Sequence, residues 1–297
     1  MTYPKVSIII LNWNGLEDTI ECLESLKKIT YPNYEVIVVD NGSAGDDAEV
    51  LKEKFGSYIH VIRNDKNYGF AEGNNIGMRY ALHNSSPDYF LILNNDTVVD
   101  SRFLTELVKV AETNEKLGIV GPKICYYDKP HMINSAGARI KWHLGLGENI
   151  GIGKIDTGQF DSISEVDCLL GAALLMKRSM VQEIGLFDER FFLLLEDTDL
   201  CIRAKKREYE IKLSPCSKIY HKGGFSAGRG TLYLYYMYRN RLLLLKKHCT
   251  LSKVILYSFY ISLRTLAAFF IYIVKRELKL AKAVINGYCD GLFKTKI

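Results

Sequence analysis

The sequence predicts an α/β protein with a mostly parallel, twisted sheet flanked by helices, followed by a helical C-terminal segment. Three observations lead to this prediction. Short apolar runs alternate with amphipathic stretches through the first 120 residues, the first four runs are followed by Asn or Asp, and the last 59 residues are both apolar and basic. A length of 297 residues suits one large domain with an appended segment, and 48% hydrophobic with 25% charged residues excludes a disordered or collagenous chain.

The first half of the chain alternates strands and helices. Strands buried on both faces read as continuous apolar runs, and we expect them at residues 6–11, 34–39, 58–62, 89–93 and 119–120. Amphipathic periodicity predicts helices between them, at residues 16–28, 46–55, 71–83 and 102–114. The short connections favour right-handed crossovers between parallel strands.

The second half of the chain is less regular. Residues 122–165 contain six glycines, which indicates a mobile segment or a β excursion that covers a site. Beyond it we expect a helix from Glu196 to Lys206 and strands at residues 166–170, 174–176, 209–213 and 217–220. We therefore expect a domain over residues 1–230, with a nucleotide-binding half (about 1–121) and an acceptor half (about 122–230), and a helical segment over residues 231–297.

Polar residues follow four of the predicted strands. Asn12 and Asn14 follow the first strand, Asp40 the second, and Asn94–Asp96 the fourth, while Asn67 lies shortly after the third. For one strand alone, turn formation is a sufficient reason for Asn or Asp. Four together predict a binding site, because ligands of such sheets lie beyond the carboxyl ends of the strands. No G-x-G-x-x-G follows the first strand, which argues against a dinucleotide site.

Two further features carry chemistry. Glu196, Asp197 and Asp199 open a predicted helix, where the helix dipole favours negative charge. Capping accounts for one acid but not for three after an apolar run, so the cluster is a candidate catalytic site. His221 ends a strand before a Gly-rich turn, a better position for a functional histidine than most.

In order and spacing, these motifs resemble those of the family 2 glycosyltransferases of the GT-A fold, in particular the rhamnosyltransferase-like branch. The resemblance runs from residue 6 to about residue 245, and the ordered set is specific although each motif alone is weak. It rests on residues 6–15, 38–43, 67–77, 91–96, 171–172, 187–189 and 196–203, and on His221 with the Gly pair and Ser226 that follow it.

The resemblance implies roles for individual residues. It assigns nucleotide-sugar binding to Asn12, Asp40, Asn67, Gly69, Asn94, Asn95 and Asp96, with Asp40 on the nucleotide base and Asn12 in the same pocket. It assigns the catalytic base to Asp197, with Glu196 beside it. It places Gly171, Ala172 and Asp199 near the donor sugar and the acceptor.

The resemblance also implies a divalent metal, Mg²⁺ or Mn²⁺. Residues 94–96 occupy the D-x-D position of the family, with Asn in place of the first acid. Metal binding therefore falls mainly on Asp96, and His221 matches a histidine that completes the metal site in some relatives. A hard ion with oxygen ligands suits the charge that develops on a leaving diphosphate.

The function that follows is an inverting transfer from a nucleoside-diphosphate sugar, such as dTDP-rhamnose or a UDP-sugar, to a hydroxyl of a glycan or lipid-linked saccharide. Asp197 is the expected general base, and the spacing alone also admits Glu196 or Asp199. Two alternatives remain open: a nucleotidyltransferase, and a non-catalytic membrane-bound protein that binds nucleotide sugars.

The C-terminal segment predicts a membrane surface as partner. From residue 239 onward, twelve Lys and Arg stand against two acids, a net charge of +10 that leaves −5 for residues 1–238. The run 254–274 is long enough to span a bilayer, but Arg264 at its middle disfavours insertion, so we expect helices on the cytoplasmic face. Packing on the body or a homo-oligomer interface is the alternative, and nucleic acid is not an expected partner. A short N-terminal apolar run and seven scattered Cys favour a cytoplasmic location.

Overall fold

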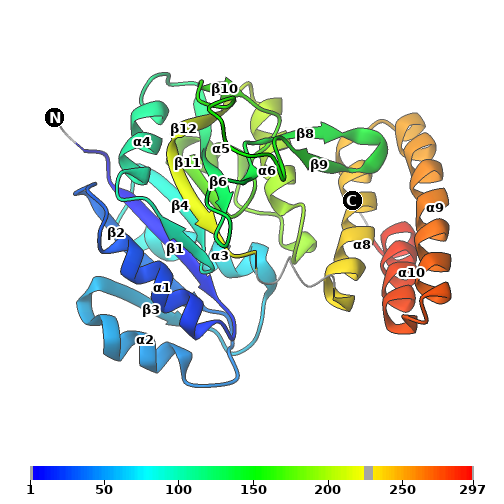
Figure 1. Ribbon diagram of the computed structural model, residues 1–297, viewed down its shortest axis with the longest axis horizontal. Coiled ribbons are helices and arrows are strands. Elements are labelled where there is room, and N and C mark those ends of the chain that lie inside the picture. Colours follow the sequence, from blue (N-terminus) through cyan, green and yellow to red (C-terminus); the bar gives the residue numbers. More distant parts are fainter. Residues whose placement is uncertain (1–2, 224–229, 296–297) are drawn as a thin grey trace.

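A computed structural model describes residues 3–223 and 230–295 and shows a sheet-based body beside a unit of three C-terminal helices (Figure 1). The expected α/β architecture is confirmed. Ser226 and its neighbours, part of the last motif singled out in the sequence, lie outside the described residues.

The central sheet has the strand order β10-β12-β6-β11-β4-β1-β2-β3, with β5 paired to β12 and β7 paired to β6. Strands β1, β2, β3 and β4 are parallel, as are β6 and β12, whereas β11 runs antiparallel between β4 and β6. The strands are β1 (Val6–Asn12), β2 (Tyr34–Asp40), β3 (Ile59–Arg63), β4 (Tyr89–Asn94), β5 (Thr97–Val99), β6 (Leu117–Tyr126), β7 (Ile133–Ser135), β10 (Ser164–Glu165), β11 (Ala173–Lys177) and β12 (Glu210–His221).

Helices cover both faces of the sheet because alternate strand residues point to opposite sides. In β1, Val6, Ile8 and Ile10 belong to one apolar core and Ile9 to the other. Helices α1 (Leu16–Leu26), α2 (Asp47–Phe55) and α4 (Phe103–Ala111) close the first core. Helices α3 (Gly69–Asn84), α5 (Arg178–Ile184) and α6 (Glu196–Lys206) close the second core. Short 3-10 turns lie at η1 (Gly56–Tyr58), η2 (Trp142–Leu144) and η3 (Glu189–Phe191).

Several expected elements of the second half differ in the structure. The strands expected at 209–213 and 217–220 form one strand, β12, with a register shift between Ser214 and Lys218 that admits the extra residues as a bulge. Residues 166–170 are not a strand, because β12 already pairs with β10 just before them and only Cys168 forms an isolated bridge. The expected excursion contains the hairpin β8 (Ala138–Lys141) and β9 (Leu146–Asn149), which extends toward the C-terminal helices (Figure 1).

The C-terminal segment forms a unit of three packed helices, α8 (Thr231–His248), α9 (Leu251–Val274) and α10 (Leu278–Phe293). Helix α8 lies between the body and the other two helices (Figure 1). It buries Leu243 and Leu244 against Phe191, Leu195 and Ile202 of the body. On its other side, α8 packs Leu242 and Leu245 against Ile261 of α9.

Candidate active site

The strand ends meet at one edge of the sheet and border a cavity of about 400 Å³. Because β11 runs antiparallel to its neighbours, its N-terminal end joins the carboxyl ends of β1, β4 and β6 at this edge. The cavity is lined by Leu11, Trp13, Asn14, Gly15, Asp18, Asn41, Asn67, Gly69, Phe70, Asn94, Asn95, Asp96, Phe192, Leu193, Leu194 and Leu232.

Asn12 and Asp40, both expected to contact the nucleotide, lie beneath this cavity and are absent from its wall. The Nδ2 of Asn12 donates to Asp40 Oδ1 (3.0 Å) and Asp47 Oδ2 (2.9 Å), and its Oδ1 accepts from Thr19 (2.9 Å). The side-chain amide of Asn12 therefore joins the ends of β1 and β2. Asn12 does not line the pocket, contrary to the expectation from the sequence. Asp40 keeps one buried oxygen, Oδ2, without a hydrogen-bond partner among the described residues.

The wall beside β2 is built by Asn41, which the sequence reasoning quoted in a motif but did not assign. Its Nδ2 donates to Asn67 Oδ1 (3.0 Å) and to the carbonyl of Gly69 (3.1 Å). Asn67 in turn accepts from the amide of Gly69 (2.7 Å). Gly69 has a φ of 84°, and a Cβ there would lie 2.5 Å from the carbonyl oxygen of Phe192, so this position requires glycine.

The β4 end brings together the residues of the proposed metal site. His221 Nε2 lies 3.1 Å from Asp96 Oδ1 and 3.4 Å from Asn94 Nδ2, because β12 ends opposite β5. The side-chain oxygen of Asn94 is buried and accepts no hydrogen bond from the described residues. Asn95 donates to Thr19 (3.0 Å), which turns it toward α1.

The donor set at Asp96 suits an ion that completes its shell with phosphate oxygens and water. Among residues 3–223 and 230–295, no three His, Cys, Asp or Glu side chains gather around one point as in a closed metal site. Mg²⁺ is often bound by one or two carboxylates together with substrate phosphates rather than by a protein cage. Asp96 with His221, and the side-chain oxygen of Asn94, which has no hydrogen-bond partner among the described residues, fit that kind of open site.

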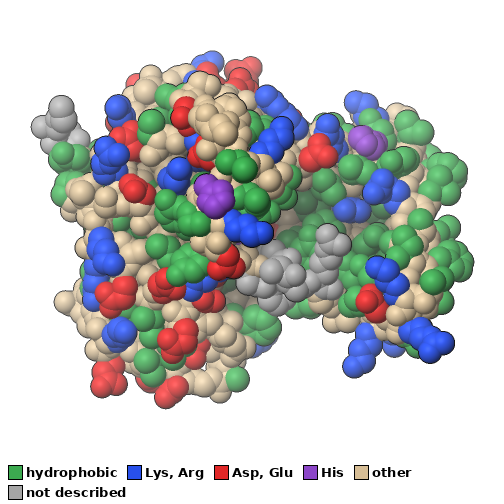
Figure 2. All heavy atoms as spheres, viewed as in Figure 1, with side chains coloured by type: hydrophobic (Ala, Val, Ile, Leu, Met, Phe, Trp, Pro, Cys, Tyr) green, Lys and Arg blue, Asp and Glu red, His purple; other side chains and the backbone are tan. Residues whose placement is uncertain are grey.

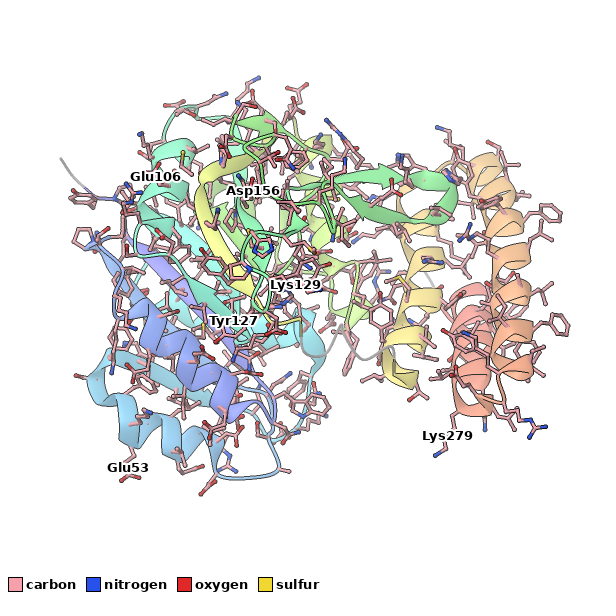
Figure 3. All side chains as sticks on the ribbon, viewed as in Figure 1. Glu53, Glu106, Tyr127, Lys129, Asp156 and Lys279 are labelled. Atoms are coloured by element: carbon pink, nitrogen blue, oxygen red, sulfur yellow. The ribbon has the colours of Figure 1, made fainter. Side chains whose placement is uncertain are left out.

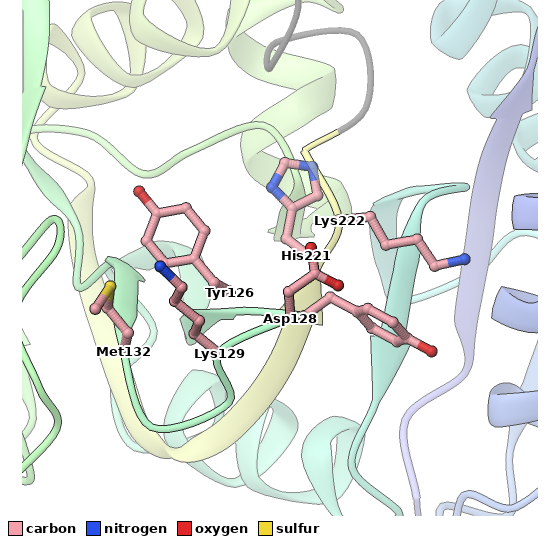
Figure 4. A pocket seen from close by; sticks show the side chains of 7 residues that line it. Tyr126, Asp128, Lys129, Met132, His221 and Lys222 are labelled. Atoms are coloured by element: carbon pink, nitrogen blue, oxygen red, sulfur yellow. The ribbon is translucent and has the colours of Figure 1, made fainter.

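His221 also lines a second hollow of about 370 Å³, together with Tyr126, Tyr127, Lys129 and Lys222 (Figure 4). Lys222 turns away from this hollow and donates to Asp18 (2.7 Å), a residue of the main cavity. Burial works to lower the pKa of Lys222, but its hydrogen bonds with Asp18 and Glu21 outweigh burial and raise it. The ammonium group therefore stays charged and offsets the negative charge of Asp18 beside the cavity.

Asp197 is not among the residues that line the cavity, and Gly171, just before β11, holds it at the same edge of the sheet. The Gly171 amide donates to Asp197 Oδ2 (2.8 Å), and the Thr198 amide donates to Oδ1 (2.6 Å). The backbone carbonyl of the next residue, Ala172, accepts a hydrogen bond from the backbone N–H of Asn94 (2.9 Å). The Asp197 carboxylate is therefore linked through residues 171 and 172 to the end of β4, just before Asp96. Burial raises the pKa of Asp197 against these hydrogen bonds.

Glu196 is held by fewer hydrogen bonds than the adjacent Asp197. It is 5% exposed, and its Oε2 has no hydrogen-bond partner among the described residues. Burial, together with the charge of Asp197, raises the pKa of Glu196 well above its ordinary value. The raised pKa of Glu196 favours its protonated form, while Asp197 is the oriented carboxyl group of the pair.

Asp199, expected near the donor sugar and the acceptor, lies elsewhere. It is fully buried and binds His248 (2.7 Å) and Lys247 (2.8 Å) of α8 and Arg203 (2.9 Å) of its own helix. Burial works to raise the pKa of Asp199, but the His248 hydrogen bond and the charges of Arg203 and Lys247 outweigh it and lower the pKa. Asp199 thus joins α6 to the C-terminal unit, because helix periodicity turns it away from Asp197.

Residues 191–195 form an approach segment that leads into the acid pair. Phe192, Leu193 and Leu194 line the cavity, and Leu232 of α8 faces them. The ring of Phe192 stacks on Tyr236 of α8, with centroids 4.9 Å apart. In the sequence this segment is only an apolar run before the acids, and nothing in an apolar run distinguishes a cavity wall from core.

Comparisons with known proteins identify the family of this chain. The sequence model of glycosyl transferase family 2 matches residues 7–185. Over 210 residues, the chain is 26% identical to the low-salt glycan biosynthesis hexosyltransferase Agl10 of Haloferax volcanii, covering 69% of this chain and 63% of that protein. It is 25% identical over 255 residues to the dTDP-rhamnosyl transferase RfbF of Shigella flexneri, covering 82% of this chain and 81% of that protein.

Solved structures show the same GT-A fold at low identity. The structure of GalNAc-T7 with UDP, GalNAc and Mn²⁺ matches 74% of this chain and 44% of that chain, with a TM-score of 0.63 and 18% identity. The mannosyltransferase PcManGT of Pyrobaculum calidifontis, in complex with GDP-Man and Mn²⁺, matches 100% of this chain and 89% of that chain, with a TM-score of 0.61 and 14% identity. Although this chain spans less than two thirds of Agl10, the family model covers more than half of the chain, which therefore belongs to glycosyl transferase family 2.

Proposed function

We propose that this protein transfers a sugar from a nucleoside-diphosphate sugar to a hydroxyl of a glycan or lipid-linked saccharide, with inversion at the anomeric carbon. The observation that carries the proposal is the position of Asp197. Its carboxylate is held by the Gly171 amide at the same sheet edge as the asparagine-lined cavity. A nucleotide-binding cavity and an oriented base side by side are what a direct displacement requires.

The donor would lie in the main cavity. Asn41, Asn67 and Gly69 form a polar wall for the nucleotide, and Asn94, Asn95 and Asp96 border the place of the diphosphate. The buried free oxygen of Asp40 lies beneath this wall, and a base N–H reaching it would satisfy an unpaired acceptor. The apolar approach segment closes the opposite side and excludes water from the donor sugar.

Asp197 would take the proton of the acceptor hydroxyl. Burial raises the pKa of Asp197 toward neutral pH, and a general base is most effective when its pKa lies near the pH at which it works. The two hydrogen bonds from Gly171 and Thr198 fix its direction before the acceptor arrives. Gly171 leaves room beside it, since a Cβ there would lie 3.2 Å from Asp197 Oδ2.

Asp96 and His221 would hold a divalent metal ion, Mg²⁺ or Mn²⁺. Bound there, the ion supplies positive charge that stabilises the leaving diphosphate. Two of the structural neighbours contain Mn²⁺ together with a nucleotide or a nucleotide sugar. The names of the relatives Agl10 and RfbF favour a hexose or rhamnose donor and an acceptor in glycan biosynthesis.

The C-terminal unit would hold the protein at the cytoplasmic face of a membrane. Helix α9 is long and apolar enough to cross a bilayer, with a mean hydropathy of 1.8, and only Ile261 and Thr265 are buried along it. Figure 2 shows hydrophobic side chains along the outer edge of this unit, with Lys and Arg at its ends. Lys279 points away from the molecule at the tip of the unit (Figure 3). This pattern suits a helix lying in the lipid interface beside anionic headgroups.

A donor panel tests the proposal. UDP, dTDP and GDP are compared by thermal shift with Mn²⁺, Mg²⁺ or chelator, and the sugar form of the tightest binder is then assayed with lipid-extract acceptors. We expect metal-dependent stabilisation by one diphosphate and release of that diphosphate on turnover. Release of inorganic diphosphate would instead indicate a nucleotidyltransferase. Donor binding without any turnover or hydrolysis would indicate a non-catalytic binding protein.

A further inference from the structure

The approach segment has a backbone conformation that its own residues disfavour. Phe192, Leu194 and Leu195 have φ values of 58°, 72° and 69°, in the left-handed region. In that region the Cβ of an ordinary residue crowds its carbonyl oxygen, so Gly, Asn and Asp are the usual occupants. Three such residues directly before Glu196 and Asp197 persist only if contacts from outside the segment hold them.

One side chain of α8 supplies most of these contacts. Asn240 is fully buried, and its Nδ2 lies 2.8 Å, 2.7 Å and 2.8 Å from the carbonyl oxygens of Phe191, Leu193 and Leu194. An amide carries two hydrogens, so at least one of them is shared between two acceptors. Of the two remaining carbonyls, that of Phe192 accepts from the backbone amides of Phe70 (2.6 Å) and Ala71 at the start of α3, and that of Leu195 accepts from the Asp199 amide (2.9 Å).

The two ends of the Asn240 side-chain amide differ in their hydrogen bonding. Its Oδ1 is buried and has no hydrogen-bond partner among the described residues, which is unfavourable. An apolar residue would avoid that penalty but would remove the Asn240 donor from the carbonyls of Leu193 and Leu194, whereas the Phe191 carbonyl would keep the Leu193 amide (2.6 Å) as donor. The part of the Asn240 side chain that stabilises the structure is therefore its NH₂ group, and all of its hydrogen bonds go to the approach segment.

We propose that Asn240 is a positioning residue for the transfer reaction: through its bonds to residues 191, 193 and 194 it sets the direction in which Asp197 points. The inference rests on the proposed function, because it takes Asp197 as the base. It makes α8 part of the active site as well as a link to the C-terminal unit. A displacement of about 1 Å in a reacting group can lower the rate about 10²-fold, so a positioning residue without substrate contact can have a large effect.

The test compares two variants of the same helix. Asn240→Ala removes the donor group, and Leu245→Ala truncates a fully buried residue that packs toward α9, away from the approach segment. For each variant we would measure the melting temperature, kcat of transfer, and donor affinity from the fluorescence of Trp13, which lines the cavity. Asn240→Ser, which keeps one hydroxyl donor, is the conservative variant.

We expect Asn240→Ala to lower kcat at least tenfold while donor Kd changes less than threefold, and Asn240→Ser to recover part of kcat. Leu245→Ala should lower the melting temperature and keep kcat within threefold. The proposal is overturned if Asn240→Ala keeps kcat, if Leu245→Ala loses as much kcat at equal loss of melting temperature, or if neither Asn240 variant folds while Leu245→Ala does. Absence of turnover in the unmodified protein with every donor would instead refute the proposed function.

Discussion

At the scale of single residues, the two adjacent acids of α6 differ in how they are held. Asp197 accepts hydrogen bonds at both oxygens, whereas Glu196 Oε2 accepts none from the described residues. Burial raises the pKa of both side chains. A base acts efficiently when its carboxylate has a fixed direction, and this supports the proposal that Asp197 rather than Glu196 takes the proton.

Asp197→Asn should therefore lower transfer at least ~10²-fold while donor affinity is kept, because the amide has the same shape but cannot accept the proton. The measurement is kcat with saturating donor and acceptor, with donor Kd measured separately. Glu196→Gln is the matched control. It should retain most of the activity and raise stability at neutral pH, since it removes a buried group whose raised pKa opposes ionisation. The reverse pattern would move the base to Glu196.

Asp96 gives a second prediction at this scale. Asp96→Ala should weaken nucleoside-diphosphate binding in Mn²⁺ and remove the difference between Mn²⁺ and chelator, because it removes the proposed carboxylate ligand. Binding in chelator should change little, and this serves as the internal control. His221→Ala should have a smaller effect, as expected of a ligand that completes a shell. Full turnover of the unmodified protein in excess chelator would contradict the metal role.

At the scale of elements, the joint between α6 and α8 is ionic. Asp199 is fully buried and contacts Lys247 and His248 of α8. The pKa of Asp199 is lowered in the folded protein, so its contribution to stability is fully present above its unfolded pKa of about 3.9. That contribution is lost as pH falls through the lower folded value.

Asp199→Asn should therefore lower the free energy of unfolding by about 3 kcal/mol at neutral pH, because Arg203 loses its carboxylate partner and Lys247 keeps only Asp188. The loss should shrink as the pH falls below about 4, where the unmodified protein also loses the contribution. Denaturant unfolding between pH 3 and pH 7 measures both effects. Glu49→Gln, which breaks an exposed pair with Arg63, should cost under about 1 kcal/mol at any pH. An equal loss in both variants would show that the joint contributes no more than a surface pair.

Sequence reasoning predicted the sheet edge because continuous apolar strands and their polar ends are local patterns. The strands ending at Asn12, Asp40 and Asn94 all lie within a residue or two of the predicted ends. The approach segment could not be predicted, because its contacts are distant in the sequence: the Leu194 carbonyl binds Asn240, 46 residues away, and the Phe192 carbonyl binds the amides of Phe70 and Ala71. For the same reason Asp199 was misplaced: its partners Lys247 and His248 belong to another helix, and the sequence does not show that the helices meet.

At the scale of the whole molecule, one side of the C-terminal unit is apolar and has no covering element among the described residues. Along α9, one exposed apolar stripe with a spacing of three or four residues comprises Ile255, Phe259, Leu263, Leu266, Phe270 and Val274. Other residues of the helix are exposed as well, among them Leu251, Leu256, Tyr260, Arg264, Ile271 and Ile273. The exposed basic residues Lys275, Arg276, Lys279 and Lys282 follow directly. Burial of one large apolar side chain contributes about 1.5–3 kcal/mol, whereas a basic residue near an anionic surface contributes about 1 kcal/mol. Lipid contact along the stripe is thus expected to dominate binding.

The full-length protein should therefore float with anionic liposomes, and high salt should release only part of it, because salt screens charge but not apolar burial. Phe259→Ser combined with Phe270→Ser should clearly weaken flotation, since it removes two large side chains from the stripe while leaving the buried face of α9 intact. Ile163→Ser, which replaces an exposed apolar residue of the body, should float like the unmodified protein. Carbonate should release the bound protein if α9 lies on the surface, whereas retention in carbonate would show that α9 spans the bilayer. A full-length protein that stays unbound and forms a dimer that the double variant dissociates would show instead that α9 joins two copies of this chain.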